Sequence, residues 1–270
     1  MQNNIDEEKI MFVTQDRVFY LGLVGRRMRA RRMGAASLYV APEGGFQLKV
    51  GNQPWEDRAL ALLPPYCPHQ VMSSCGKIIN ILIEPEHVSA GALSKVMERL
   101  NRPGEHNDLV TRIRQAPHRL RAVPDAESLS PQRFDHLVMG YSIDGRVLDP
   151  RIEAALDDFI TEAWRNELSA AEYARGIGLS ASRFLHLFKE ETGTSFRNHR
   201  MWKRARAFLY HANRTGSLTD LAFDLGYPDS SHFSHSIRKT FGLKPRSIRL
   251  GSRDLKIVSA STSVSSCPAW

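Results

Sequence analysis

The pattern of apolar and polar residues divides the chain into a strand-rich front part and a helical rear part. Between residues 12 and 85, short apolar runs such as RVFYLGLV, GFQLKV and IINILIE alternate with turn residues, among them Gly44-Gly45 and Pro64-Pro65. Short runs with this spacing predict a small antiparallel barrel or sandwich. From residue 88 onward apolar positions recur at helical spacing. We therefore expect an α+β protein with two domains.

The helical pattern itself falls into a middle region and a rear region. Three helices are expected within residues 88–140, and Pro117 is expected to end or kink the second of them. Asp149-Pro150 then has the signature of an N-cap followed by a proline in the first turn. These boundaries predict a front domain at 1–142, a rear all-α domain at 148–252 and a disordered serine-rich tail at 253–270.

One motif occurs twice in the rear domain, at residues 169–192 and 217–241. Each copy combines a capping-box pair, a glycine suited to a left-handed turn and a polar N-cap for a second helix. These residues are Ser169 with Glu172, Gly178 and Ser180 in the first copy, and Ser217 with Asp220, Gly226 and Asp229 in the second. The combination predicts two helix–turn–helix units. A basic segment, FRNHRMWKRARAFLYHA, joins them, and we expect it to form one helix about 26 Å long.

Composition limits the functional classes. The net charge of +8 favours an anionic partner such as nucleic acid. Three scattered cysteines do not form a disulfide framework, and no apolar run approaches the roughly 18–20 residues of a membrane span. We expect a cytoplasmic protein that does not bind membranes.

The stretch from about residue 151 to 249 resembles the DNA-binding domain of AraC-type (AraC/XylS) transcription regulators. The resemblance rests on GLSASRFLHLFKEETGTSF, on LAFDLGYPDSSHFSHSIRKTFGLKPRSIR, and on Phe241-Gly242 with Pro245 and Arg249 at the end of the motif. It implies a regulator, commonly an activator, that binds double-stranded promoter DNA, forms a homodimer, contacts RNA polymerase and responds to a small-molecule effector or to dimerisation. Its ligand, its target sequence and the sign of regulation stay open.

The same resemblance assigns candidate DNA contacts by position. The base-facing residues are Ser182, Arg183, Leu185, His186, Ser230, Ser231, Ser234 and His235. The phosphate-contacting residues are Lys189, Arg197, Arg200, Lys203, Arg206, Arg238 and Lys239. The family commonly has arginine where His186 and His235 stand, which predicts a weaker preference for guanine at those steps.

The segment SLYVAPEGGFQLKVGNQPWEDRALALLPPYCPHQV resembles a cupin-like effector domain. Metal-binding cupins carry an H-x-H pair where Arg31-Arg32-Met33 stands here, so we expect no metal and no cofactor. The candidate effector pocket is formed by Arg31, Tyr39, Trp55, Tyr66 and His69. His69 has a second interpretation, as a hydrogen-bonded residue at the start of a strand.

Five arginines (Arg26, Arg27, Arg29, Arg31 and Arg32) lie within seven residues that contain no acid. They are either a solvated loop or an anion site for an acidic effector or DNA phosphate. Three other functions are weighed against a regulator: a cupin-type enzyme, a DNA-repair methyltransferase with a DNA-binding appendage, and a non-specific nucleoid protein. The missing metal histidines and the absence of a cysteine cluster argue against both enzymes, so we expect no catalytic residues.

Overall fold

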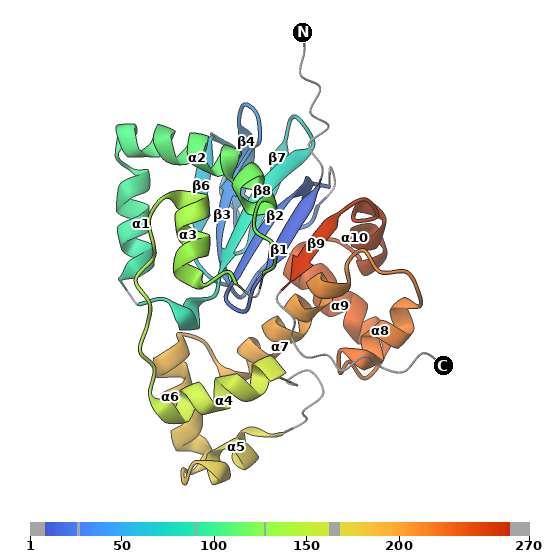
Figure 1. Cartoon of the computed structure of the whole chain (residues 1–270). Helices are drawn as coiled ribbons and strands as arrows, with labels where there is room; N and C mark the ends of the chain where they lie inside the picture. The colour runs from blue at the N-terminus through green and yellow to red at the C-terminus, as the bar shows by residue number, and fades with distance from the viewer. Residues whose placement is uncertain (1–8, 26–27, 90, 127, 162–167, 260–270) are drawn as a thin grey trace.

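The structure is a computed structural model that describes residues 9–25, 28–89, 91–126, 128–161 and 168–259 (Figure 1). The strands are β1 (Ile10–Val13), β2 (Arg17–Leu23), β3 (Ala36–Val40), β4 (Phe46–Val50), β5 (Glu56–Arg58), β6 (Leu60–Leu63), β7 (His69–Ser73), β8 (Lys77–Ile83) and β9 (Lys256–Ser259). Strands β1 to β8 lie within residues 10–83, and the rest of the described chain is mainly helical apart from β9. The expected α+β class with a β-rich front domain is therefore confirmed.

Within the described residues the strands form a sheet in the order β6-β3-β8-β2-β1-β9 and a smaller sheet in the order β5-β4-β7. The larger sheet is buried on both faces, because successive residues of its central strands enter different cores. Phe19 and Ile81 are paired across β2 and β8 and belong to one core. Val18 and Leu82, the next pair, belong to the other. This explains why the strands have near-continuous apolar sequences instead of alternating ones.

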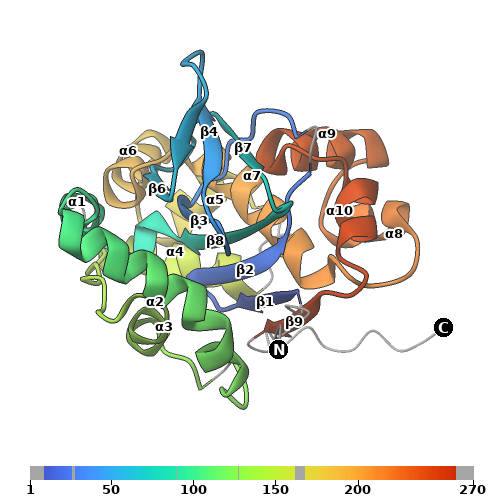
Figure 2. The same ribbon diagram turned by 90° about the horizontal axis from the view of Figure 1, so that it is seen from above.

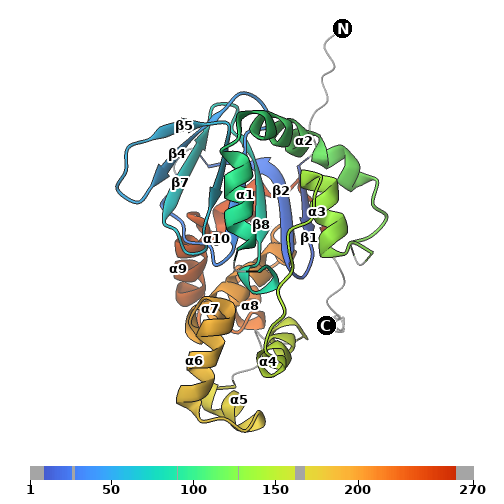
Figure 3. The same ribbon diagram turned by 90° about the vertical axis from the view of Figure 1, so that its left-hand side faces the viewer.

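One face of the larger sheet is covered by α1 (Ala92–Leu100), α2 (Pro103–Arg121) and α3 (Pro131–Met139) (Figure 3). A short 3₁₀ segment, η1 (Pro85–His87), precedes them. Pro117 was predicted to end or kink α2. It does not end the helix, which continues to Arg121. Ile113, Ala116 and Leu120 flank the proline and are completely buried. Burial of this face offsets the backbone hydrogen bond that the proline cannot donate.

The rear part contains α4 (Pro150–Thr161), α5 (Ala170–Gly176), α6 (Ala181–Thr192), α7 (Phe196–Ala207), the 3₁₀ segment η2 (Phe208–His211), α8 (Leu218–Asp224), α9 (Ser230–Phe241) and α10 (Pro245–Gly251). Both helix–turn–helix units, α5–α6 and α8–α9, are present as expected. Ser169 and Glu172 form the predicted capping box. Gly178 and Gly226 have φ values of +68° and +72°, which fits the predicted left-handed turns. The connecting helix is shorter than expected, because its last turn is η2.

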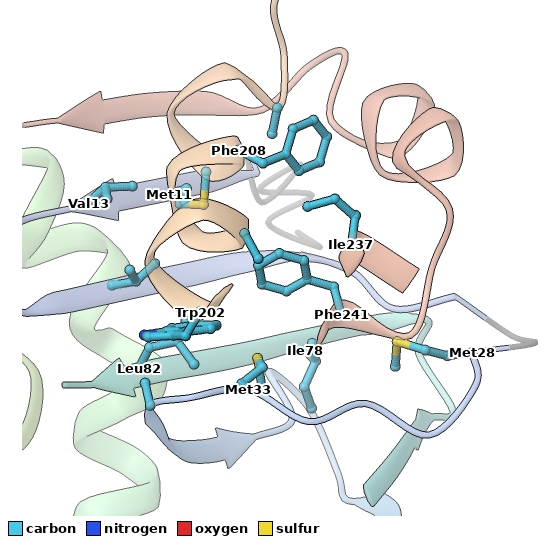
Figure 4. Packing of buried hydrophobic residues seen from close by; sticks show 14 of the residues in the cluster. Met11, Val13, Met28, Met33, Ile78, Leu82, Trp202, Phe208, Ile237 and Phe241 are labelled. Carbon is cyan, nitrogen blue, oxygen red and sulfur yellow. The ribbon is translucent and has the colours of Figure 1, made fainter. Parts of the chain in front are cut away.

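The two helix–turn–helix units differ in what they pack against. The first has a core of its own, in which Phe184, Phe188 and Phe196 pack with Ile152 of α4. The second shares one core with the connecting segment and the β-rich domain: Ile237 and Phe241 of α9, Trp202 of α7 and Phe208 of η2 pack with Met11, Val13, Met33, Ile78 and Leu82 (Figure 4). Figure 1 shows α4–α6 lying apart from the sheets, whereas α9 and α10 lie beside them.

The predicted disordered tail is wrong for its first part. Residues Lys256–Ser259 form β9, which pairs in parallel with β1, with Ile10 opposite Lys256 (Figure 2). The serine-rich residues 260–270 lie outside the described part of the chain, as do Arg26 and Arg27. A segment from the rear of the chain thus completes the sheet of the front domain.

Candidate nucleic-acid interface and the adjoining cavity

The first recognition helix, α6, presents the predicted base-facing residues to solvent. Phe184 and Phe188 point into the core, and the neighbouring positions Arg183, Leu185 and His186 are exposed. Leu185 keeps 42% of its surface exposed, although it is a large apolar residue. Ser180 caps the helix by accepting a hydrogen bond from the amide of Arg183. The face that carries Ser182, Arg183, Leu185, His186 and Lys189 is therefore accessible to a ligand.

The second recognition helix, α9, is similar in layout. Asp229 caps it through the amides of Ser231 and His232, both at 2.8 Å from Oδ1. Phe233 and Ile237 are buried. Ser230, Ser231, His235 and Lys239 are exposed, and Ser234 and Arg238 are half-buried. His186 and His235 thus occupy equivalent exposed positions in the two units.

The connecting helix α7 departs from the prediction at two of its four basic candidates. Arg197 is exposed, and Arg200 is half-buried with Nη1 3.0 Å from the carbonyl oxygen of Leu168. Lys203 and Arg206 were expected to contact phosphate, and this expectation is wrong for the arrangement seen here. Their side chains are only 14% and 6% exposed, because both contact carboxylates of the front domain.

These carboxylates are Glu84 and Glu86, at the end of β8 and in η1. Glu84 lies 2.7 Å from Arg206 Nε and 3.1 Å from Lys203 Nζ, and its Oε2 accepts a hydrogen bond from Trp202 Nε1 at 2.7 Å. Glu86 Oε1 lies 2.6 Å from Lys203 Nζ. We name Glu84, Glu86, Trp202, Lys203 and Arg206 the interdomain ion cluster. Only Lys203 and Arg206 of this cluster were candidates from the sequence. Glu84 and Glu86 were missed, because nothing in their spacing places them against a helix that begins about 110 residues further along the chain.

The charges in the interdomain ion cluster stabilise one another. Burial alone raises the pKa of Glu86, but Lys203, His199 and His87 together hold it below its usual value. Burial lowers the pKa of Lys203, yet Glu84 and Glu86 raise it above its usual value. Burial also lowers the pKa of His199, which adjoins the cluster, to about 4, so this histidine is neutral at pH 7. Glu86 and Lys203 therefore stay ionised near neutrality, and their ion pair helps to hold α7 on the β-rich domain.

Three of the predicted pocket residues lie together inside the front domain. His69 Nε2 is 2.9 Å from the hydroxyl of Tyr39 and 3.2 Å from Arg31 Nε, which donates to it. His69 Nδ1 lies 2.8 Å from the carbonyl oxygen of Cys67, so this nitrogen carries the proton. Burial and the neighbouring Arg31 lower the pKa of His69 to about 3. The interpretation of His69 as a satisfied strand residue thus agrees with its contacts.

The main apolar cavity lies next to this group but is not the pocket that was expected. It has a volume of about 550 Å³ and lies between the β-rich domain and the second helix–turn–helix unit. Its walls include Val24, Met28 and Ile78 from the front and Phe241, Leu243 and Ile248 from the rear. Of the predicted pocket residues, Arg31 lines it, whereas Tyr39, Trp55, Tyr66 and His69 do not. Trp55 lies between β4 and β5 and is 37% exposed.

Two polar side chains on this cavity each have one nitrogen without a hydrogen-bond partner among the described residues. Arg31 is 8% exposed and its Nη2 has no hydrogen-bond partner there, and the same holds for Nδ2 of Asn80. An unpaired guanidinium nitrogen on an apolar cavity is energetically costly unless a bound anion or water accepts a hydrogen bond from it. Asn80 was missed at sequence level, because it occurs inside the apolar run IINILIE and resembles a core position.

The described residues form a β-rich domain followed by two helix–turn–helix units and a connecting helix, and helix–turn–helix units are a common DNA-binding motif. Residues 173–250 match the helix-turn-helix domain family. The chain is 33% identical over 153 residues to the HTH-type transcriptional activator RhaS of Escherichia fergusonii, covering 53% of this chain and 52% of RhaS. It is 30% identical over 110 residues to the HTH-type transcriptional regulator ExsA of Pseudomonas aeruginosa, covering 39% and 38%. The rear part of the chain therefore contains a helix–turn–helix domain and is similar in sequence to these two transcription regulators.

These sequence relatives are matched over about half of their length or less. The solved structures extend the likeness to the whole fold: ToxT from Vibrio cholerae strain SCE256, with an unsaturated fatty acid bound, superposes with a TM-score of 0.53 at 14% identity, covering 88% of this chain and 96% of ToxT. ToxT from Vibrio cholerae O395 gives the same TM-score over 87% and 98%. At this identity the comparison establishes the two-domain fold. In the part of the chain that the structure describes, no helix is long and apolar enough to cross a membrane.

Proposed function

We propose that the protein is a sequence-specific, DNA-binding regulator of transcription, and an activator like RhaS. The observation that carries the proposal is the pair of accessible recognition helices, which present matched histidines, His186 and His235, from capped and internally packed units. A pair of such helices at a suitable spacing fits two neighbouring major-groove segments. Ser182, Arg183, Leu185, Ser230, Ser231 and Ser234 complete the proposed base-facing set, and Lys189, Arg197, Arg200, Arg238 and Lys239 the phosphate-contacting set.

The first experiment is to sequence the genomic fragments that the purified full-length protein retains, and then to measure binding to the recovered site. Replacing His186 or His235 with alanine should weaken binding to that site by about tenfold, because one base contact is lost. Binding to an unrelated duplex should change much less. Equal losses on both duplexes would show that the histidines do not read bases. Retention without any shared sequence would favour a non-specific nucleoid protein.

We further propose that the interdomain cavity binds an amphipathic carboxylate as effector. Its volume of about 550 Å³ falls within the usual size of ligand pockets, and its walls are mainly apolar. The unpaired Nη2 of Arg31 supplies one buried cation at the wall. The fatty acid in ToxT, a protein of the same fold, agrees with this chemistry.

A ligand in this cavity contacts both the β-rich domain and the second helix–turn–helix unit. It therefore stabilises one position of the second unit relative to the first unit, which has a separate core. Since the two recognition helices must match the spacing of two groove segments, a change in their relative position alters DNA affinity.

The effector proposal is tested by thermal unfolding of the full chain with a long unsaturated fatty acid and with the alcohol of the same chain length. At a concentration of 100 Kd, a ligand stabilises by about 2.7 kcal/mol, so the acid should raise Tm clearly and the alcohol much less. Arg31→Gln should abolish the difference between the two, with Arg58→Gln as the control for lost charge. Equal responses to acid and alcohol in the unmodified protein would contradict the role of Arg31.

Homodimerisation and contact with RNA polymerase are proposed from the resemblance to AraC-type regulators. Sedimentation equilibrium of the full chain tests the first, and transcription from the recovered site with purified polymerase tests the second. A monomer at all concentrations, or unchanged transcript levels, would contradict them.

A further inference from the structure

Among the described arginines of the arginine-rich segment (residues 26–32), Arg31 lines the effector cavity and the others do not. The other described arginines, Arg29 and Arg32, are exposed and lie at the end of the second recognition helix. We propose that Arg29 and Arg32 bind DNA phosphates beside α9, so that the front domain forms part of the DNA-contacting surface. This inference rests on the proposed DNA-binding function and extends it beyond the helix–turn–helix domain.

The segment is attached to α9 by its backbone. The amide of Arg32 donates to the carbonyl oxygen of Lys239 at 3.1 Å, and the amide of Arg29 donates to that of Gly242 at 3.1 Å. Gly242 ends the helix with φ of +76°, and a Cβ atom there would lie 2.5 Å from the carbonyl oxygen of Arg29. The two backbones are therefore in direct contact. Figure 4 shows Met28, the residue before Arg29, near Phe241, the last residue of α9.

The other side of the segment is attached to the smaller sheet. Arg31 and His69 exchange two backbone hydrogen bonds, at 2.9 and 3.2 Å, and the buried Arg31 side chain contacts the His69 ring. Arg31 therefore points inward, and Arg29 and Arg32 are left on the outside. Since both ends of this short stretch are bound, the two exposed arginines keep a constant position relative to α9.

The position next to α9 is one that phosphates occupy when a recognition helix enters DNA. A helix with its side chains is about 10–12 Å wide, nearly the width of the major groove at about 12 Å, so the two phosphate backbones run along its flanks. In homeodomains the C-terminal end of the recognition helix contacts the DNA backbone. Lys239, Lys244 and Arg246 are exposed near the same end. Arg29 and Arg32 enlarge a cationic surface where the helix leaves the groove.

Salt dependence of DNA binding distinguishes this proposal from a merely solvated loop. The measurement is fluorescence anisotropy of the full chain with the recovered site and with an unrelated duplex, at several salt concentrations. The variant Arg29→Gln/Arg32→Gln should bind both duplexes roughly tenfold more weakly at 0.1 M salt. The slope of log K against log salt should become less steep by about 0.9 for each lost phosphate contact. Arg29→Lys/Arg32→Lys should keep most of the slope, because it keeps the charge.

The matched control is Arg58→Gln/Arg102→Gln, which removes two exposed arginines from β5 and from the residue before α2. A glutamine variant of Arg29 and Arg32 with the slope of this control would overturn the inference. If the unmodified protein binds all duplexes equally, the proposed sequence-specific function fails, but a slope change on those duplexes still supports the phosphate contacts. A protein that binds no duplex would overturn both.

Discussion

Replacing Glu84 with glutamine is the sharpest test of how the two parts of the protein are held together. Its carboxylate is completely buried. It accepts a hydrogen bond from Trp202 Nε1 at 2.7 Å and lies 3.1 Å from Lys203 Nζ and 2.7 Å from Arg206 Nε. Breaking a buried ion pair by neutralising one partner typically costs about 3–5 kcal/mol, because the other charge stays buried. Glutamine still offers Trp202 an acceptor oxygen, and Lys203 keeps Glu86. We therefore expect the lower end of that range, about 3 kcal/mol.

The assay is urea unfolding at pH 7, followed by circular dichroism and tryptophan fluorescence. With a slope of about 1–3 kcal/mol per molar urea, a loss of this size moves the midpoint by about 1 M or more. Glu56→Gln is the matched control, since it also removes a glutamate from an arginine pair, but its side chain is 51% exposed. Exposed pairs contribute less than about 1 kcal/mol. Equal midpoint shifts for the two variants would refute the reasoning that burial makes Glu84 decisive.

Two further predictions concern a backbone contact and a buried histidine. Gly193→Ala and Gly242→Ala place a side chain at φ of +73° and +76°, which costs about 1–2 kcal/mol each. Of the two, only Gly242 has a backbone oxygen, that of Arg29, 2.5 Å from the new Cβ. Gly242→Ala should therefore lower the free energy of unfolding in urea more than Gly193→Ala does. Equal decreases would contradict the contact with Arg29. The pKa of His69 is about 3 when folded, below its ordinary value of 6.5, so the unfolded chain takes up a proton that the folded chain does not. The stability contributed by neutral His69 is therefore complete above pH 6.5 and declines as pH falls toward 3, by about 1.4 kcal/mol per pH unit. His69→Gln should remove this part of the slope of unfolding free energy against pH, and unchanged slopes between about pH 4 and 6 would contradict it.

Local features of the rear domain were predictable because they depend on neighbours in sequence. The capping box of Ser169 and Glu172 and the glycine turn at Gly178 each involve residues a few positions apart. The exposed positions of His186 and His235 follow from helical periodicity once Phe184 and Phe233 are assigned to the core. Hence the recognition helices, their caps and their outward faces could be assigned without tertiary information.

Features that join distant segments were not predictable in this way. Lys203 and Arg206 have the sequence character of phosphate contacts, and only the fold brings Glu84 and Glu86 against them. Strand β9 was expected to be disordered, because a short segment shows no partner until β1 provides an edge. The cavity likewise needs walls from both parts of the chain, so a barrel-mouth pocket was expected where Trp55 and Tyr66 stand.

By itself, the sequence determined that this protein carries two capped helix–turn–helix units behind a β-rich domain, because capping, turn and periodicity are short-range and act within about one helical turn or one strand pair. Tertiary structure decided which basic side chains stay exposed, where the apolar cavity lies, and that the second unit shares its core with the front domain while the first does not. These properties depend on burial, and burial is a property of the packed chain that no local pattern contains.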